Sequence, residues 1–233
     1  MVFIGSRASD YGAMKYTLPD NVVHLETHYL HDFQRGPERV VRGRRGDRQA
    51  FEDVRCMHAA FHGGNAERGE GMARFDALAK DLVSGKRLAL EDFLYSERAW
   101  EFVAEQYKTR CLDPSFVDYF WSVRIMHQPL WQLGRIARDL IPAKVYHSVS
   151  TGYAGFLGAL LKHSRGRPLL LSEHGIYTKE RKIDLFQSEW IHDNRNVFQK
   201  EVTEISYFRQ LWIEFFEWLG RFCYEASDDI VAL

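Results

Sequence analysis

Short apolar runs alternate with amphipathic stretches in the last third of the chain, and this alternation predicts an α/β fold. Lys144–Val149 and Pro168–Ser172 are strand-like, while Tyr153–His163 between them has helical spacing and is opened by Gly152. A helix that links two strands of one sheet makes those strands parallel. A final strand is predicted over Asp229–Leu233. The pattern is that of a Rossmann-like, mostly parallel sheet flanked by helices.

The rest of the chain adds two short strands and many helices. Strands are predicted at Val2–Gly5 and Val22–Leu25, and together with the later strands they should form one largely parallel sheet. Apolar positions at steps of three and four predict a helical insertion over about residues 48–140 and a helix over Asn196–Tyr224. The expected helices of the insertion cover residues 48–62, a stretch ending near Leu82, residues 91–107 and residues 115–140, the last kinked or divided after Gln128 by Pro129.

Composition narrows the functional classes. Lys and Arg number 31 against 32 Asp and Glu, so the net charge gives no reason to expect nucleic acid as a partner. The three cysteines form no CxxC pair, which favours a reducing cytoplasm and argues against a structural zinc site. Neither a membrane span nor a signal peptide is predicted, and the serine-hydrolase motif GxSxG is absent.

Two charged clusters have simple interpretations. Residues 34–48 combine six arginines with three glycines, which is typical of a mobile basic surface loop. Histidines gather at positions 24, 28 and 31, and His58 and His62 lie one helical turn apart. Because no glutamate follows His58 as in HExxH, ordinary surface or core histidines are favoured over a metal site.

The segment from His147 to Gly155 runs from a strand end through small and hydroxyl residues into a helix. Open α/β sheets bind ligands outside the carboxyl ends of their strands, where helix N-termini favour anions. His147 and Ser148 are therefore candidate binding residues. Alternatively, Gly152, Gly155 and Gly158 only let the helix pack closely, since the GxGxxG fingerprint is absent.

The segment from Ser172 to Arg181 follows the next strand and should reach the same edge of the sheet. It concentrates acids, bases and cations in a predicted loop. Helix capping explains part of this run, but not His174 before Gly175. The candidates in this segment are Glu173, His174, Tyr177, Lys179, Glu180 and Arg181.

The two segments, Tyr146–Gly155 and Glu173–Arg181, resemble the cytoplasmic glycosyltransferase of Pel exopolysaccharide biosynthesis, as do Val2–Ser6 and Leu18–His24. That family is similar to the retaining GT-B glycosyltransferases of family 4. The resemblance implies a single N-terminal, acceptor-side lobe over residues 1–233, and hexose transfer from UDP-glucose to a growing polysaccharide with retention.

The resemblance also implies residue roles. His174 corresponds to the histidine near the transferred sugar, and the binding residues are His147, Ser148, Glu173, Tyr177, Lys179, Glu180 and Arg181. The nucleotide-sugar is a substrate, so no separate cofactor or metal is expected. Partners are the donor, the polysaccharide acceptor and the inner-membrane synthase subunits, which would bring a cytoplasmic protein to the membrane.

Relative to that family, the chain begins and ends abruptly on strand-like runs. We therefore expect it to lack the first glycine-rich loop and the C-terminal nucleotide-sugar lobe, and to be inactive alone. The alternative is a non-catalytic interaction module that docks to a polysaccharide synthase complex through Arg35–Arg48 or the middle helices.

Overall fold

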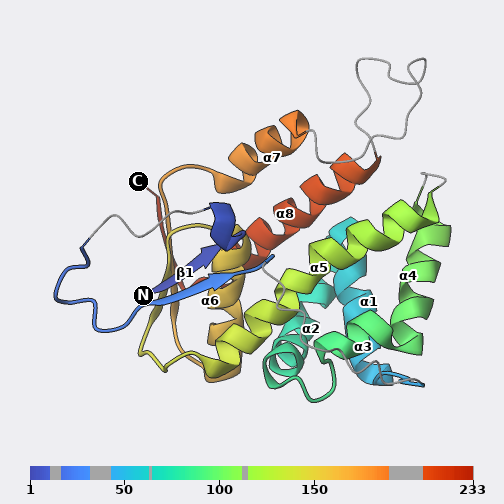
Figure 1. Cartoon of the computed structure of the whole chain (residues 1–233), viewed down its shortest axis with the longest axis horizontal. Helices are drawn as coiled ribbons and strands as arrows, with labels where there is room; N and C mark the ends of the chain where they lie inside the picture. Colours follow the sequence, from blue (N-terminus) through green and yellow to red (C-terminus); the bar gives the residue numbers. More distant parts are fainter. Residues whose placement is uncertain (11–16, 32–42, 63–64, 112–114, 189–206, 233) are drawn as a thin grey trace. The chain divides into compact units, whose positions relative to one another are not determined.

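The computed structural model describes residues 1–10, 17–31, 43–62, 65–111, 115–188 and 207–232. By backbone contacts the chain divides into two compact units, Met1–Val40 and Val41–Leu233 (Figure 1). No helix in these ranges is long and apolar enough to cross a membrane. The two units are described separately below.

The first unit contains a parallel strand pair, β1 (Val2–Gly5) and β2 (Glu26–Tyr29), and a short 3₁₀ turn, Ala8–Asp10. The prediction for β1 is confirmed, but β2 begins four residues after the predicted Val22. The pairing of β2 with β1 begins where Glu26 N donates a hydrogen bond to Met1 O at 3.0 Å. Val22 N instead donates to Pro19 O and forms a turn. The apolar Val22 and Val23 misled the prediction because β2 is a largely polar strand.

The second unit begins with a helical block, as predicted for residues 48–140. Its helices are α1 (Arg48–His62), α2 (Asn65–Ser84), α3 (Leu90–Tyr95), α4 (Glu97–Arg110) and α5 (Phe116–Asp139). The single helix predicted over 91–107 is two helices, because Ser96 Oγ accepts from Ala99 N at 3.1 Å and starts a new helix.

Helix α5 runs through Pro129 without a break, so the predicted division is wrong. Proline removes one helical hydrogen bond. The buried face of α5 continues on both sides of it, with Met126 before it and Leu133 after it. At Gly134 the helix lies so close to α2 that an added Cβ would be 2.6 Å from Leu82 O. Packing of this whole face keeps the two halves of α5 in one helix.

A three-stranded sheet completes the second unit, with β3 (Tyr146–Ser148), β4 (Leu169–Glu173) and β5 (Asp229–Ala232) in the order β3-β4-β5. Both pairings are parallel, with His147 opposite Leu170 and Leu171 opposite Ile230. The mixed α/β architecture with parallel strands is confirmed. The described strands pair in two sheets, however, and not in the single sheet that was predicted. Apolar periodicity can identify a strand, but it does not show which other strand pairs with it.

Three helices accompany this sheet: the crossover helix α6 (Gly152–Arg165), α7 (Tyr177–Gln187) and α8 (Tyr207–Ala226). Residues 196–206 of the last predicted helix lie outside the described residues. Phe75 of α2, Phe156 of α6 and Phe222 of α8 form one aromatic cluster, with Phe75 and Phe222 centroids 3.8 Å apart. The helical block and the sheet therefore share one core (Figure 1).

Two buried histidines lie in the helical core. His58 of α1 and His127 of α5 stack with ring centroids 5.4 Å apart, and they are 5% and 7% exposed. His127 Nδ1 pairs with Val123 O at 2.8 Å. Burial lowers the pKa of His127 to about 4 from its usual 6.5, since no water stabilises the imidazolium.

This low pKa predicts that the fold loses stability in mild acid. Below about pH 6.5 His127 becomes protonated in the unfolded chain, whereas in the folded chain it becomes protonated only near pH 4. We therefore expect His127 to lower the free energy of unfolding by about 2 kcal/mol as the pH falls from 8 to 5. Urea titrations should show a smaller acid loss for His127→Leu. An equal acid loss in both proteins would contradict the assignment.

Candidate functional site

The edge of the sheet where β3 and β4 end brings the two predicted segments together. His147 Nε2 lies 2.9 Å from Ser172 Oγ, which joins the two strands just before their carboxyl ends. Ser148 is buried, and its hydroxyl donates to Ser150 O at 2.7 Å. His147 is thus an exposed group at the edge, while Ser148 shapes the turn that leads into α6.

Gly152 begins α6 in a backbone conformation that few other residues adopt, with φ of +73°. A Cβ at this position would also lie 2.8 Å from Cε1 of Tyr177. The first turn of α6 is therefore covered by the Tyr177 ring. The glycines of α6 do serve close packing, since Gly155 faces Cys223 and Gly158 faces Leu169.

Glu173 ends β4 and is held by α8. The Tyr224 hydroxyl donates a short hydrogen bond to Glu173 Oε2, and burial together with this bond raises the pKa of Tyr224. The phenol therefore stays protonated as a donor. The other carboxylate oxygen, Oε1, is buried without a hydrogen-bond partner in the described part of the chain.

The prediction that Ser172–Arg181 is a loop holds only for His174–Ile176, because Ser172 and Glu173 belong to β4 and Tyr177–Arg181 form the start of α7. Glu180 Oε1 lies against Gly175, where an added Cβ would be 2.5 Å from it. The Arg181 guanidinium lies 4.8 Å from the centroid of the Phe216 ring, while Lys179 is exposed. The charged run is thus a helix whose inner side chains contact α8.

His174 is exposed in the turn between β4 and α7 and makes no hydrogen bond to another described residue. The hydrogen bonds of His147 and Ser148 go to Ser172 and Ser150. The structure therefore leaves the His174 imidazole available at the edge and does not fix it there.

Several buried polar atoms at this edge have no hydrogen-bond partner among the described residues. They are Thr151 Oγ1, Tyr153 OH, Glu173 Oε1, Thr178 Oγ1 and Arg181 Nε. Buried polar atoms in folded proteins nearly always have a partner, so such a group indicates bound water or ligand. Thr151, Tyr153 and Thr178 were not predicted, although all three lie within the two segments.

The Phe216 ring of α8 connects two of these groups. Tyr153 packs edge-on to Phe216 with centroids 5.6 Å apart, and the Arg181 guanidinium lies over the same ring. Burial raises the pKa of Tyr153, and the positive charge of Arg181 acts in the opposite direction. The neutral phenol and the guanidinium can bind hydroxyl and phosphate oxygens.

Other reactive side chains have structural roles. Burial raises the pKa of the Cys223 thiol, so it is a poor nucleophile. His24 and His28 of the first unit both contact Glu26, at 2.7 and 3.0 Å. The described residues contain no group of three or more His, Cys, Asp or Glu suited to a metal ion, and the His62 side chain lies outside them.

Gly155 sets the distance between α6 and α8, and we expect Gly155→Ala to destabilise the fold. The new Cβ would lie 2.6 Å from Cys223 Sγ and 3.0 Å from Ser150 O, at a cost of about 1–3 kcal/mol in unfolding free energy. Gly69→Ala on α2 is the control, since its Cβ would have nothing within 4 Å. Equal stability of the two variants in urea would refute this close approach.

Comparisons with known proteins give a family but no function. No curated protein and no solved structure matches the chain. One family model matches over residues 1–233, and it is described as a domain of unknown function, DUF3492. The chain belongs to this DUF3492 family.

Proposed function

We propose that this chain is a lobe of a retaining glycosyltransferase with GT-B architecture, which transfers glucose from UDP-glucose to a growing exopolysaccharide. One observation carries the proposal: the segments at the carboxyl ends of β3 and β4 contain five buried polar atoms without a hydrogen-bond partner among the described residues, and such ends are where open α/β sheets bind ligands. Other such atoms, at Gln106 and Arg209, lie outside these segments. The five atoms belong to the same two segments that resemble the Pel glycosyltransferase.

The side chains at the edge suit such a ligand. In retaining transfer the leaving diphosphate gains negative charge, which cations and helix N-termini stabilise. Arg181 is a half-buried cation whose Nε is buried and whose Nη1 lies 3.9 Å from Asp184 Oδ2, and the Tyr153 and Thr178 hydroxyls supply hydrogen bonds. His174, which is exposed beside them, would position or polarise the transferred sugar, and Lys179 would meet acceptor hydroxyls or phosphate.

The setting follows from the same proposal. The second unit would be the Rossmann-like part of the acceptor-side lobe, with the helical block as its insertion. The nucleotide-sugar and the polysaccharide would be substrates, with no further cofactor. The protein would act in the cytoplasm, at the inner membrane, through contacts with synthase subunits.

A second candidate, a docking module for such a synthase complex, is favoured by one surface. Val117, Trp121 and Ile125 follow each other at steps of four along α5 and are 62%, 55% and 48% exposed. Such an apolar stripe on a helix is typical of protein contacts. Residues 35–42 of the basic segment named for docking lie outside the described residues.

Donor binding separates the two candidates. In a two-lobed protein that contains this chain we expect UDP-glucose to bind, and Arg181→Ala to weaken its binding about tenfold or more, because a charge-assisted hydrogen bond is lost. Lys182→Ala is the matched control on α7, since Lys182 pairs with Glu217 at 3.0 Å. Calorimetric titration measures both. Absent UDP-glucose binding, or equal losses in the two variants, would favour the docking module.

His174 tests the transfer step. In an active enzyme that contains this chain, His174→Ala should lower kcat by about 10²-fold or more, as loss of one preorganised stabilising group does. The melting temperature should stay unchanged, because the side chain is exposed and makes no hydrogen bond to a described residue. UDP release during glucose transfer measures turnover. A wild-type rate combined with a lower melting temperature would assign His174 to the core.

A further inference from the structure

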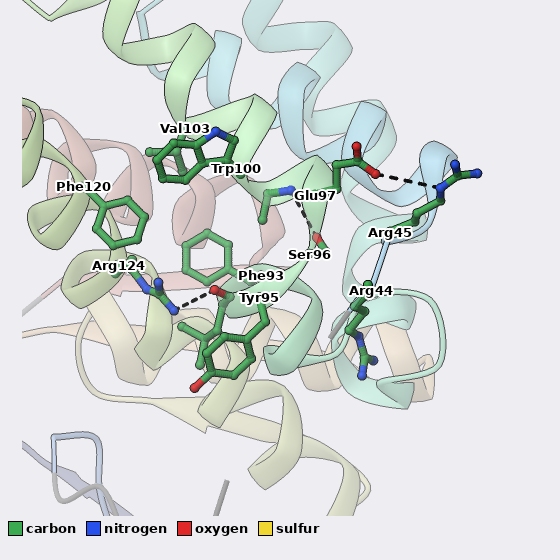
Figure 2. A pocket seen from close by; sticks show the side chains of 13 residues that line it. Arg44, Arg45, Phe93, Tyr95, Ser96, Glu97, Trp100, Val103, Phe120 and Arg124 are labelled. Carbon is green, nitrogen blue, oxygen red and sulfur yellow. Dashed lines mark hydrogen bonds and ion pairs between the residues drawn. The ribbon is translucent and has the colours of Figure 1, made fainter. Parts of the chain in front are cut away.

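A pocket of about 640 Å³ lies in the helical block, between α3, α4, α5 and the segment before α1. Figure 2 shows Phe120 and Arg124 of α5 on one side of the pocket and Arg44 and Arg45 on the other, with Tyr95 and Trp100 between them. The volume falls within the range of about 300–1,000 Å³ typical of small-molecule sites. None of the candidate residues at the sheet edge lines it.

Backbone hydrogen bonds hold the segment that forms one wall. Glu97 N and Arg98 N, at the start of α4, donate to Arg44 O and Arg45 O at 2.9 and 3.2 Å. Arg98 Nε donates to Gly46 O at 3.2 Å. The basic segment was predicted to be a mobile loop, but the carbonyls of Arg44 and Arg45 accept from free N–H groups at the start of α4. This wall of the pocket is therefore preformed.

Aromatic rings make up much of the lining. Phe93, Tyr95, Trp100 and Phe120 all contribute, and Trp100 is 55% exposed. The Arg124 guanidinium lies 4.9 Å from the Phe120 centroid and 5.7 Å from that of Tyr95, and it donates to Leu94 O at 2.8 Å. Arg124 thus holds the rings of α3 and α5 in place.

Arg44 and Arg124 are held by partners in the pocket, while Arg45 and Glu97 form a loose pair at its rim, with side chains 87% and 64% exposed. Arg44 forms a short ion pair with the buried Asp92, and Arg45 lies 3.8 Å from Glu97. A phosphate would have to compete with these carboxylates for the guanidinium groups. The rim instead offers donors from Arg45 and acceptors from Glu97 side by side, next to apolar rings.

We propose that this pocket binds the sugar rings of an uncharged oligosaccharide. A pyranose presents an apolar C–H face that can stack on Trp100 and Tyr95, and hydroxyls at its edge that can donate to Glu97 and accept from Arg45. No transfer reaction is needed for this binding. The inference therefore stands independently of the function proposed for the sheet edge.

The test is calorimetric titration of the chain with three hexasaccharides: β-1,4-linked glucose, α-1,4-linked glucose and β-1,4-linked N-acetylglucosamine. We expect at least one to bind, and Trp100→Ala to weaken its binding about tenfold or more through loss of the stacked ring. Phe186→Ala is the matched control, because Phe186 of α7 is also an exposed aromatic residue, 41% exposed, but does not line the pocket.

Other outcomes overturn the proposal. If no hexasaccharide binds the wild-type chain, or if Phe186→Ala weakens binding as much as Trp100→Ala does, the pocket is not a saccharide site. Competition by inorganic phosphate that disappears at high salt would indicate an anion site instead. Arg181→Ala should leave saccharide affinity unchanged, and a loss there would move the binding to the sheet edge.

Discussion

The close contact between α6 and α8 is the constraint on which the second sheet and its edge depend. Gly155 lets α8 approach until Cys223 Sγ lies against the first turns of α6, 3.8 Å from Gly152 O. From this position α8 reaches both neighbouring elements. It supplies Tyr224 to Glu173 at the end of β4, Gly220 to Thr178 of α7, and Phe216 to Arg181. A wider spacing would remove all three contacts at once.

The sequence predicted the βαβ unit well because its signals are local. The strands β3 and β4 begin at Tyr146 and Leu169, close to the predicted positions. The predicted topology also brought the two segments together, and His147 does contact Ser172. The prediction failed at α7, which has one buried residue, Leu185, and no side-chain cap at Ile176. This helix is fixed by α8, a tertiary contact that periodicity does not encode.

The sequence predicted which types of side chain lie at the sheet edge better than it predicted what each of them contacts. Arg181 was expected as a cation in a loop, yet it lies on α7 with its guanidinium over an aromatic ring and its Nε buried. Tyr153 and Thr151 were passed over because hydroxyls in a glycine-rich helix start look like packing. The basic segment shows the same limit, since Arg44 and Arg45 matter through carbonyls that accept from α4. The sequence shows which side chains are charged, but only the structure shows which of them already have a hydrogen-bond or ion-pair partner.

The two candidate sites of the second unit differ in whether their polar groups already have partners, and they therefore suit different ligands. At the sheet edge, Tyr153 OH, Thr178 Oγ1 and Arg181 Nε are buried without a hydrogen-bond partner among the described residues, although Arg181 Nη1 lies 3.9 Å from Asp184, so a ligand with charged or hydroxyl oxygens would gain their hydrogen bonds. In the helical pocket each arginine already contacts a carboxylate or a carbonyl, and what remains accessible is aromatic surface. An anionic ligand gains little there, whereas a sugar ring gains apolar contact without breaking an ion pair. One core, built around Phe75, Phe156 and Phe222, connects the helices and the sheet that carry both candidate sites.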